Sequence, residues 1–143
     1  MTTSMIGVLL LGSIAWPGGL YAQPVSDPMG KAVKTDDMKW ERLDDGFEIS
    51  ILYTNPKTQA TYLVIRGPGN QHIARHWHSS NESITVLKGT FTVAHDGSAE
   101  QVQLSPGGFA YMPARMIHEA WTGDGGATYF ITVDGKWDVT FVK

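Results

Sequence analysis

The chain has 143 residues, of which 42% are hydrophobic and 17% charged, so it can bury a core and is not typical of a disordered protein. The formal charge is -3 and no run of five or more basic residues occurs, which argues against nucleic acid as a partner. The absence of Cys excludes disulfides, thiolate metal sites and cysteine nucleophiles.

Residues 6–16 form an apolar run that is followed by Pro17-Gly18-Gly19. A membrane-spanning helix needs about 20 apolar residues, so no stable membrane insertion is expected. The run is typical of the hydrophobic part of a secretory signal peptide, here residues 1–22 with cleavage after Ala22. An N-terminal strand or a disordered arm is the alternative. The signal peptide predicts a periplasmic or extracellular, that is secreted, protein.

The segment 23–38 is polar, interrupted by Pro and without periodicity, and we expect an N-terminal arm there. Residues 39–143 are then the folded domain. Short strands are predicted throughout it, over residues 47–53, 59–66, 83–88, 91–95, 102–104, 109–112, 118–122, 128–133 and 137–142. Gly89-Thr90 is expected to be a tight hairpin, and residues 123–126 a loop. This pattern predicts an all-β antiparallel sandwich or barrel.

Three of the five His residues occur in an informative pattern. His76 and His78 are two positions apart, so on a strand both imidazoles project from the same face. Glu82 follows across a short bend, and His118 lies at the start of a later strand after a Pro-marked turn. Neutral imidazoles with one carboxylate suit a divalent transition metal. Histidines on a solvent-facing strand are the alternative explanation.

Two spaced motifs carry a family resemblance. His76-x-His78-x3-Glu82-x6-Gly89 resembles the first motif of the cupin superfamily, and Gly107-x5-Pro113-x4-His118 resembles the second. The resemblance implies a single-domain antiparallel jelly-roll (cupin) β-barrel that holds one metal ion. Carried over to this chain, the metal ligands are His76, His78, Glu82 and His118.

The chain departs from these motifs at positions that are not ligands. Arg115 stands where the second motif usually has Gly, and Trp121 where it usually has Asn. The turn before His118 and the lining of the pocket are therefore expected to differ from the family pattern.

Two further residues are candidates for a catalytic role beside the metal. His72 has the same strand parity as His76, and Tyr111 alternates with residues expected to face the interior, which would place its hydroxyl near the metal. Glu119 follows His118 directly and should point to the opposite face. Four aromatic residues are candidates for a platform that binds sugar rings, with ordinary packing as the alternative: Tyr62, Trp121, Tyr129 and Trp137.

Three imidazoles and one carboxylate leave coordination positions open for water, dioxygen, peroxide or substrate. The leading hypothesis is a secreted mononuclear-metal oxidoreductase that uses Cu or Fe, with Mn, Ni and Zn also compatible. The resemblance implies dioxygenase-like chemistry on a small molecule or a carbohydrate such as cellulose. The alternatives are a non-catalytic binding or sensing protein and a non-redox metal-dependent isomerase or lyase. The resemblance also implies a homodimer, in which segment 23–38 can exchange between partners.

Overall fold

The computed structural model describes residues 30–143, and residues 31–143 form one compact unit. The predicted signal peptide and residues 23–29 of the predicted arm lie outside the described residues. After a single 3-10 turn, η1 (Thr35–Asp37), all regular structure in the described part is strand: β1 (Glu41–Arg42), β2 (Glu48–Thr54), β3 (Thr61–Gly67), β4 (His72–Trp77), β5 (Glu82–His95), β6 (Gln101–Leu104), β7 (Phe109–Met112), β8 (His118–Val133) and β9 (Thr140–Phe141). The expectation of an all-β fold is confirmed. No helix within this part is long and apolar enough to cross a membrane.

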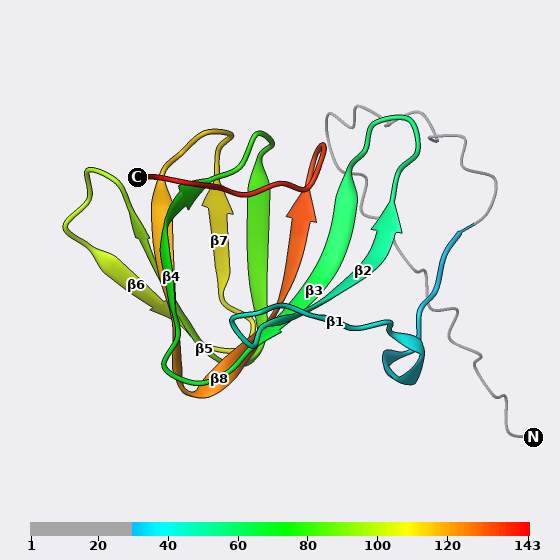
Figure 1. Cartoon of the computed structure of the whole chain (residues 1–143), viewed down its shortest axis with the longest axis horizontal. Helices are drawn as coiled ribbons and strands as arrows, with labels where there is room; N and C mark the ends of the chain where they lie inside the picture. The colour runs from blue at the N-terminus through cyan, green and yellow to red at the C-terminus, as the bar shows by residue number, and fades with distance from the viewer. Residues whose placement is uncertain (1–29) are drawn as a thin grey trace, which may run out of the picture. The chain divides into compact units, whose positions relative to one another are not determined.

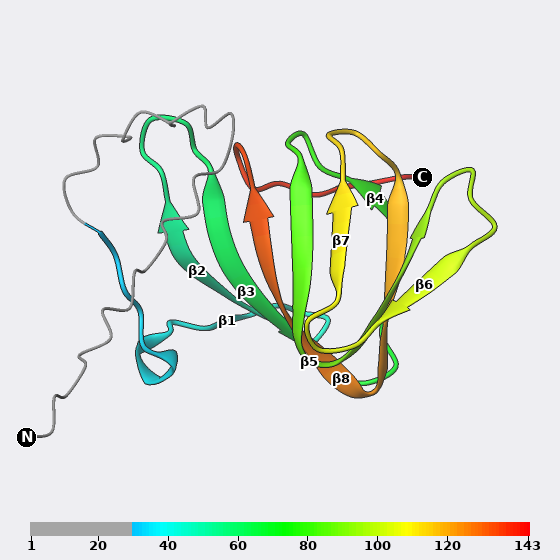
Figure 2. The same cartoon turned by 180° about the vertical axis from the view of Figure 1, so that it is seen from behind.

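Two long strands, β5 and β8, organise the barrel. They pair antiparallel from Glu82 opposite Val133 to His95 opposite His118, and both curl back on themselves (Figures 1 and 2). One half of this ladder carries β3, β2 and β7 on its edges, and the other half carries β4, β9 and β6. A single antiparallel sheet therefore folds into two facing layers.

The predicted hairpin at Gly89-Thr90 and the predicted loop at residues 123–126 are wrong, because both segments lie inside continuous strands. Gly89 and Gly126 have φ of 76° and 77°, a conformation that costs other L-residues about 1–2 kcal/mol each. The two backbones also touch at this point, since a Cβ on Gly89 would lie 2.0 Å from the carbonyl oxygen of Gly126. These glycines bend paired strands rather than reversing the chain.

The predicted strand over residues 137–142 is reduced to the two residues of β9. The segment ahead of β9 makes other contacts. The carboxylates of Asp134 and Asp138 accept hydrogen bonds from backbone N–H groups of the loop at residues 79–81. The strand β1 was not predicted, since two residues carry no readable periodicity.

The interior of the barrel is apolar. Phe91 packs on Tyr129 with ring centroids 4.5 Å apart, and the other fully buried apolar side chains include Leu63, Val86 and Met112. Each such side chain contributes roughly 1.5–3 kcal/mol on burial. This packing makes a rigid wall beside the polar residues described next.

Candidate metal centre

The four predicted ligands come from three strands and meet inside the barrel. His76 lies in β4 and His78 directly after it, while Glu82 opens β5 and His118 opens β8. All four side chains are buried, none more than 6% exposed. The Oε2 atom of Glu82 lies 3.3 Å from Nε2 of His78 and 3.4 Å from Nε2 of His118. One ring nitrogen from each histidine lies within 4.8 Å of the others, so the three buried histidines can bind one metal ion.

A β-bulge decides which residues of β4 face inward. The register of β4 against β8 shifts between Ile73 and His76, so Ile73 and His76 both line the interior. The expectation that His72 shares the face of His76 is therefore wrong, because the extra residue reverses the parity. His72 is half-exposed on the outer face, where its Nε2 lies 2.9 Å from Oε2 of Glu119. The outward direction predicted for Glu119 is confirmed.

Each inner imidazole is oriented by a backbone carbonyl. Nδ1 of His76 donates to Ala74 at 2.8 Å, Nδ1 of His78 to Asp138 at 2.5 Å, and Nδ1 of His118 to Met116 at 3.0 Å. A carbonyl only accepts, so the proton of each neutral ring sits on Nδ1 and the Nε2 lone pair is free. Three Nε2 lone pairs are therefore available inside the barrel, and those of His78 and His118 lie beside the Glu82 carboxylate.

Asp138 holds His78 by two routes. Its carbonyl orients the imidazole, and its carboxylate accepts hydrogen bonds from the backbone N–H of Ser79 at 2.9 Å and from the Ser79 hydroxyl at 2.5 Å. Trp137 stacks on His78, with ring centroids 5.2 Å apart and planes 21° apart. No sequence pattern pointed to Asp138, since its role depends on a contact with a residue 60 positions away.

Burial and the neighbouring groups set the protonation states in the cluster. Burial and the neighbouring His118 lower the pKa of His76 to about 4, so this ring is neutral near pH 7. Burial raises the pKa of Glu82, but the imidazoles of His118 and His78 beside its carboxylate outweigh burial and bring the pKa to about 2. Burial opposes the charged form of His78, yet the Glu82 carboxylate outweighs it and raises the pKa of His78. The carboxylate is therefore ionised and His76 is ready to donate its lone pair.

These residues fit a divalent transition metal. Nε2 of His78 and Oε2 of Glu82 are buried without a hydrogen-bond partner, which is costly unless another group satisfies both atoms. A cation between the imidazoles and the carboxylate satisfies them together. The donor set is closed by protein on one side and faces a cavity on the other.

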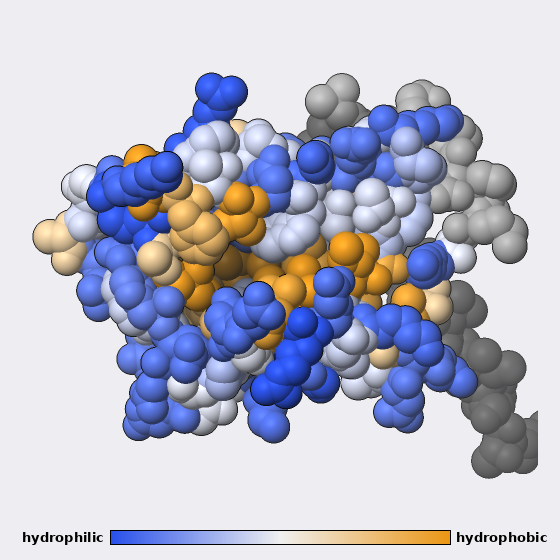
Figure 3. All heavy atoms as spheres, in the orientation of Figure 1, coloured by the Kyte–Doolittle hydropathy of each residue, from blue (hydrophilic) through white to orange (hydrophobic). Residues whose placement is uncertain are grey.

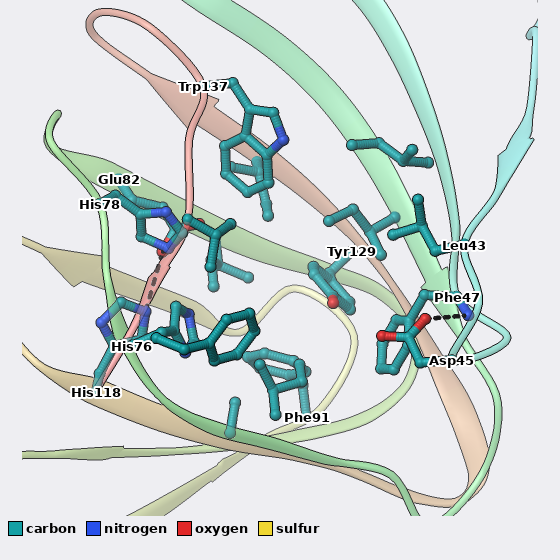
Figure 4. Close-up of a pocket in the computed structure, with 18 of the residues that line it drawn as sticks. Leu43, Asp45, Phe47, His76, His78, Glu82, Phe91, His118, Tyr129 and Trp137 are labelled. Atoms are coloured by element: carbon teal, nitrogen blue, oxygen red, sulfur yellow. Dashed lines mark hydrogen bonds and ion pairs between the residues drawn. The ribbon is translucent and has the colours of Figure 1, made fainter. Parts of the chain in front are cut away.

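The cavity has a volume of about 350 Å³, within the range of small-molecule sites. Figure 3 shows a hollow with hydrophobic residues around it on one face of the barrel. In Figure 4 the metal-binding cluster lies at one end of this cavity, Asp45 and Phe47 at the other, and Tyr129 between them. Most of the wall is aliphatic or aromatic, including Ile49, Ile65, Ile84 and Phe91.

Tyr111 does not face this cavity, and the expectation of a hydroxyl near the metal is wrong. The side chain is 51% exposed and its neighbour Met112 is buried instead. The register explains the difference, because Met112 pairs with the inward-facing Glu82 and Tyr111 with Ser83. The predicted alternation of inward and outward side chains along β7 was wrong by one residue.

The four aromatic candidates for a sugar platform do not share one surface. Tyr129 and Trp137 line the cavity. Tyr62 is exposed beside Tyr53, with ring centroids 6.0 Å apart. Trp121 stacks on the outward-facing His72 at 4.9 Å, so its departure from the motif does not alter the cavity.

Arg115, the other departure from the motif, adopts φ 66°. This is the left-handed conformation for which Gly is the least strained residue. The backbone N–H of Arg115 nevertheless donates to the carbonyl of His78 at 2.8 Å. The turn therefore contacts the segment that carries His78, although Arg115 is more strained in this conformation than Gly would be.

Comparison with known proteins agrees with this architecture. Residues 29–136 match the family described as ChrR Cupin-like domain. Quercetin 2,3-dioxygenase of Bacillus subtilis (strain 168) is 31% identical over 71 residues, 48% of this chain and 20% of that protein, so the chain spans about a fifth of the curated relative it matches.

Solved structures with this fold are more distant in sequence. KdgF from Halomonas sp. is 19% identical with a TM-score of 0.63, over 76% of this chain and 96% of that chain. The polyketide cyclase RemF from Streptomyces resistomycificus is 18% identical with a TM-score of 0.66, over 80% and 87% of the two chains. The DMSP lyase DddQ from Ruegeria pomeroyi DSS-3 is 16% identical with a TM-score of 0.63, over 73% and 61%. The jelly-roll barrel, the two motifs and the family match together make this chain a member of the cupin superfamily.

Proposed function

We propose that this protein is a metal-dependent oxidoreductase that activates dioxygen or peroxide and transforms a small molecule bound in the cavity. The observation that carries the proposal is the meeting of three imidazole Nε2 atoms and one buried carboxylate at the wall of that cavity. The partial similarity to a dioxygenase supports the redox assignment.

A divalent ion bound by these residues supplies Lewis acidity and, as Cu or Fe, one-electron redox chemistry. Mn, Ni and Zn are compatible with the same donors. His76, His78 and His118 keep their lone pairs in place through backbone hydrogen bonds. Glu82 offsets part of the cation's charge, and the apolar wall keeps water away from the bound molecule.

The test loads the metal-stripped protein with Cu(II), Fe(II), Mn(II), Ni(II) or Zn(II) in turn. Metal content is measured by elemental analysis, and oxygen or peroxide consumption with benzoylacetone, a chelating diketone. We expect consumption with Cu or Fe, its loss in His78→Ala, and its retention in the control His72→Ala, whose side chain faces outward. Full metal occupancy without consumption of either oxidant would overturn the proposal. Turnover with Zn(II) and no oxidant would favour a lyase or isomerase, and binding without turnover a sensing protein.

A small molecule is a better substrate for this site than a polymer such as cellulose. The enclosed wall of the cavity supports the former, whereas Tyr62 and Trp121 lie away from it. Soluble oligosaccharide released from cellulose by the metal-loaded protein would reverse this preference.

Secretion and dimerisation remain proposals about the whole chain. Secretion rests on the sequence of residues 1–22, and N-terminal sequencing of protein recovered from the periplasm or medium tests it. Dimerisation is tested by light scattering at micromolar concentration, where a monomeric mass contradicts it.

A further inference from the structure

The cavity is acidic as well as apolar. Apart from the four metal-binding residues, its polar groups are the carboxylates of Glu41 and Asp45, the hydroxyl of Tyr129 and the indole N–H of Trp137. Neither Lys nor Arg occurs among the described residues that line it. Glu41 and Asp45 are solvent-exposed, so the potential that they create in the cavity opposes anions but is partly screened by water.

Asp45 presents a carboxylate at the end of the cavity away from the histidines (Figure 4). It lies in the turn between β1 and β2, and its Oδ1 accepts a hydrogen bond from the backbone N–H of Phe47 at 3.1 Å. Within residues 30–143 no donor contacts its Oδ2 atom. The turn thus fixes this side chain and leaves one carboxylate oxygen for a ligand.

Tyr129 is a second, independent sign of a ligand. Its side chain is only 3% exposed, and its hydroxyl has no hydrogen-bond partner among the described residues although it lines the cavity. Burial, followed by the charges of Glu82 and Asp45, raises its pKa, so the hydroxyl stays protonated and can donate. Because the Tyr129 ring is buried and its hydroxyl opens onto the cavity, a ligand oxygen placed there can accept its proton.

We infer that the substrate is a mainly apolar molecule without an anionic group, whose distal end carries a hydroxyl that donates to Asp45, and whose middle carries an oxygen that accepts from Tyr129. Its other end points to the metal-binding cluster. This inference rests on the proposed function and adds the substrate class. A carboxylate at the distal end is excluded, because it would face Asp45 without a cation to pair with.

The test compares three probes that differ at one position: benzoylacetone and its para-hydroxy and para-carboxy derivatives. Binding is measured by calorimetry to the full chain, both metal-free and loaded with redox-inert Zn(II). We expect the hydroxy probe to bind about tenfold more tightly than the carboxy probe in both forms. Asp45→Asn should reduce this preference to less than about threefold, and Tyr129→Phe should weaken all three probes about threefold or more.

Matched controls separate these effects from general changes in charge or folding. Asp44→Asn removes the same charge from the adjacent exposed residue, which does not line the cavity, and Tyr62→Phe removes an outer hydroxyl. Both should leave the ranking unchanged. Equal or tighter binding of the carboxy probe, an unchanged ranking in Asp45→Asn, or no binding of any probe would overturn the inference. Failure of the proposed function is distinguishable, because it removes the metal-dependent turnover but not the ranking in the metal-free protein.

Discussion

The contribution of the Glu82 charge to metal binding can be tested directly in the candidate metal centre. Glu82→Gln keeps the shape of the side chain but removes a negative charge 3.3 and 3.4 Å from two imidazole nitrogens. Groups that only support metal ligands change affinity by about 10–100-fold, so we expect this carboxylate to account for about 100-fold. At a metal concentration of 100 times the wild-type Kd, bound metal stabilises the wild type by about 2.7 kcal/mol. The same concentration stabilises the variant by only about 0.4 kcal/mol, from the same linkage relation.

The assay is thermal unfolding with and without Zn(II) at that fixed concentration. The difference of about 2 kcal/mol corresponds to a metal-induced rise in Tm that is about 8 °C smaller in the variant. Comparing each protein with its own metal-free form cancels the effect of the substitution on the metal-free fold. Glu119→Gln is the matched control, because Glu119 adjoins His118 but pairs with His72 outside the barrel. A full metal-induced rise in Glu82→Gln, or an equal loss in Glu119→Gln, would refute the reasoning.

Three further predictions concern the metal-free protein. Unfolded chains take up a proton at His76 near pH 6.5, but the folded protein does so only near pH 4. The contribution of His76 to the free energy of unfolding should therefore fall as the pH drops through this window, by at most about 1.4 kcal/mol per pH unit. Urea midpoints that change with pH equally in the wild type and in His76→Gln would contradict this. Gly89→Ala should lower the free energy of unfolding in urea by at least about 2 kcal/mol, because its Cβ would meet the Gly126 carbonyl. Gly97 has φ 80° and open space around it, so the control Gly97→Ala should cost about 1 kcal/mol. Equal losses would show that the contact with Gly126 is unimportant. Arg115→Gly should raise the free energy of unfolding by up to about 1 kcal/mol by relieving the left-handed φ, while Arg115→Ala should not, and a lower Tm for the glycine variant would count against this.

The positions of His76, His78 and Glu82 were predictable because their spacing is local. His76 lies near the end of β4, His78 directly follows that strand, and Glu82 needs only the short loop that comes next, whereas His118 was predicted from the second motif of the family. The predicted inward directions of the His72 and Tyr111 side chains were wrong because the alternation along each strand was assigned one residue out of register. A bulge inside β4 leaves no mark in the sequence, since its cause is the pairing of β4 with β8.

The long bent strands and the far end of the cavity were not predictable from local patterns. Gly89 and the glycines before Ala127 are typical of turns, and only their contact with each other shows that they bend a ladder. Asp45 resembles any exposed acid in a turn. Its place in the cavity depends on how the β1–β2 turn meets the opposite layer, which no spacing along the chain records.

The bent β5–β8 ladder has a consequence for how the protein matures. Glu82 and His118 stand at opposite ends of that ladder, paired to Val133 and His95, and they meet only because the ladder doubles back. In a nascent chain in which only half of the β5–β8 ladder has paired, Glu82 and His118 stay apart. The complete set of four side chains therefore comes together only after the barrel has closed.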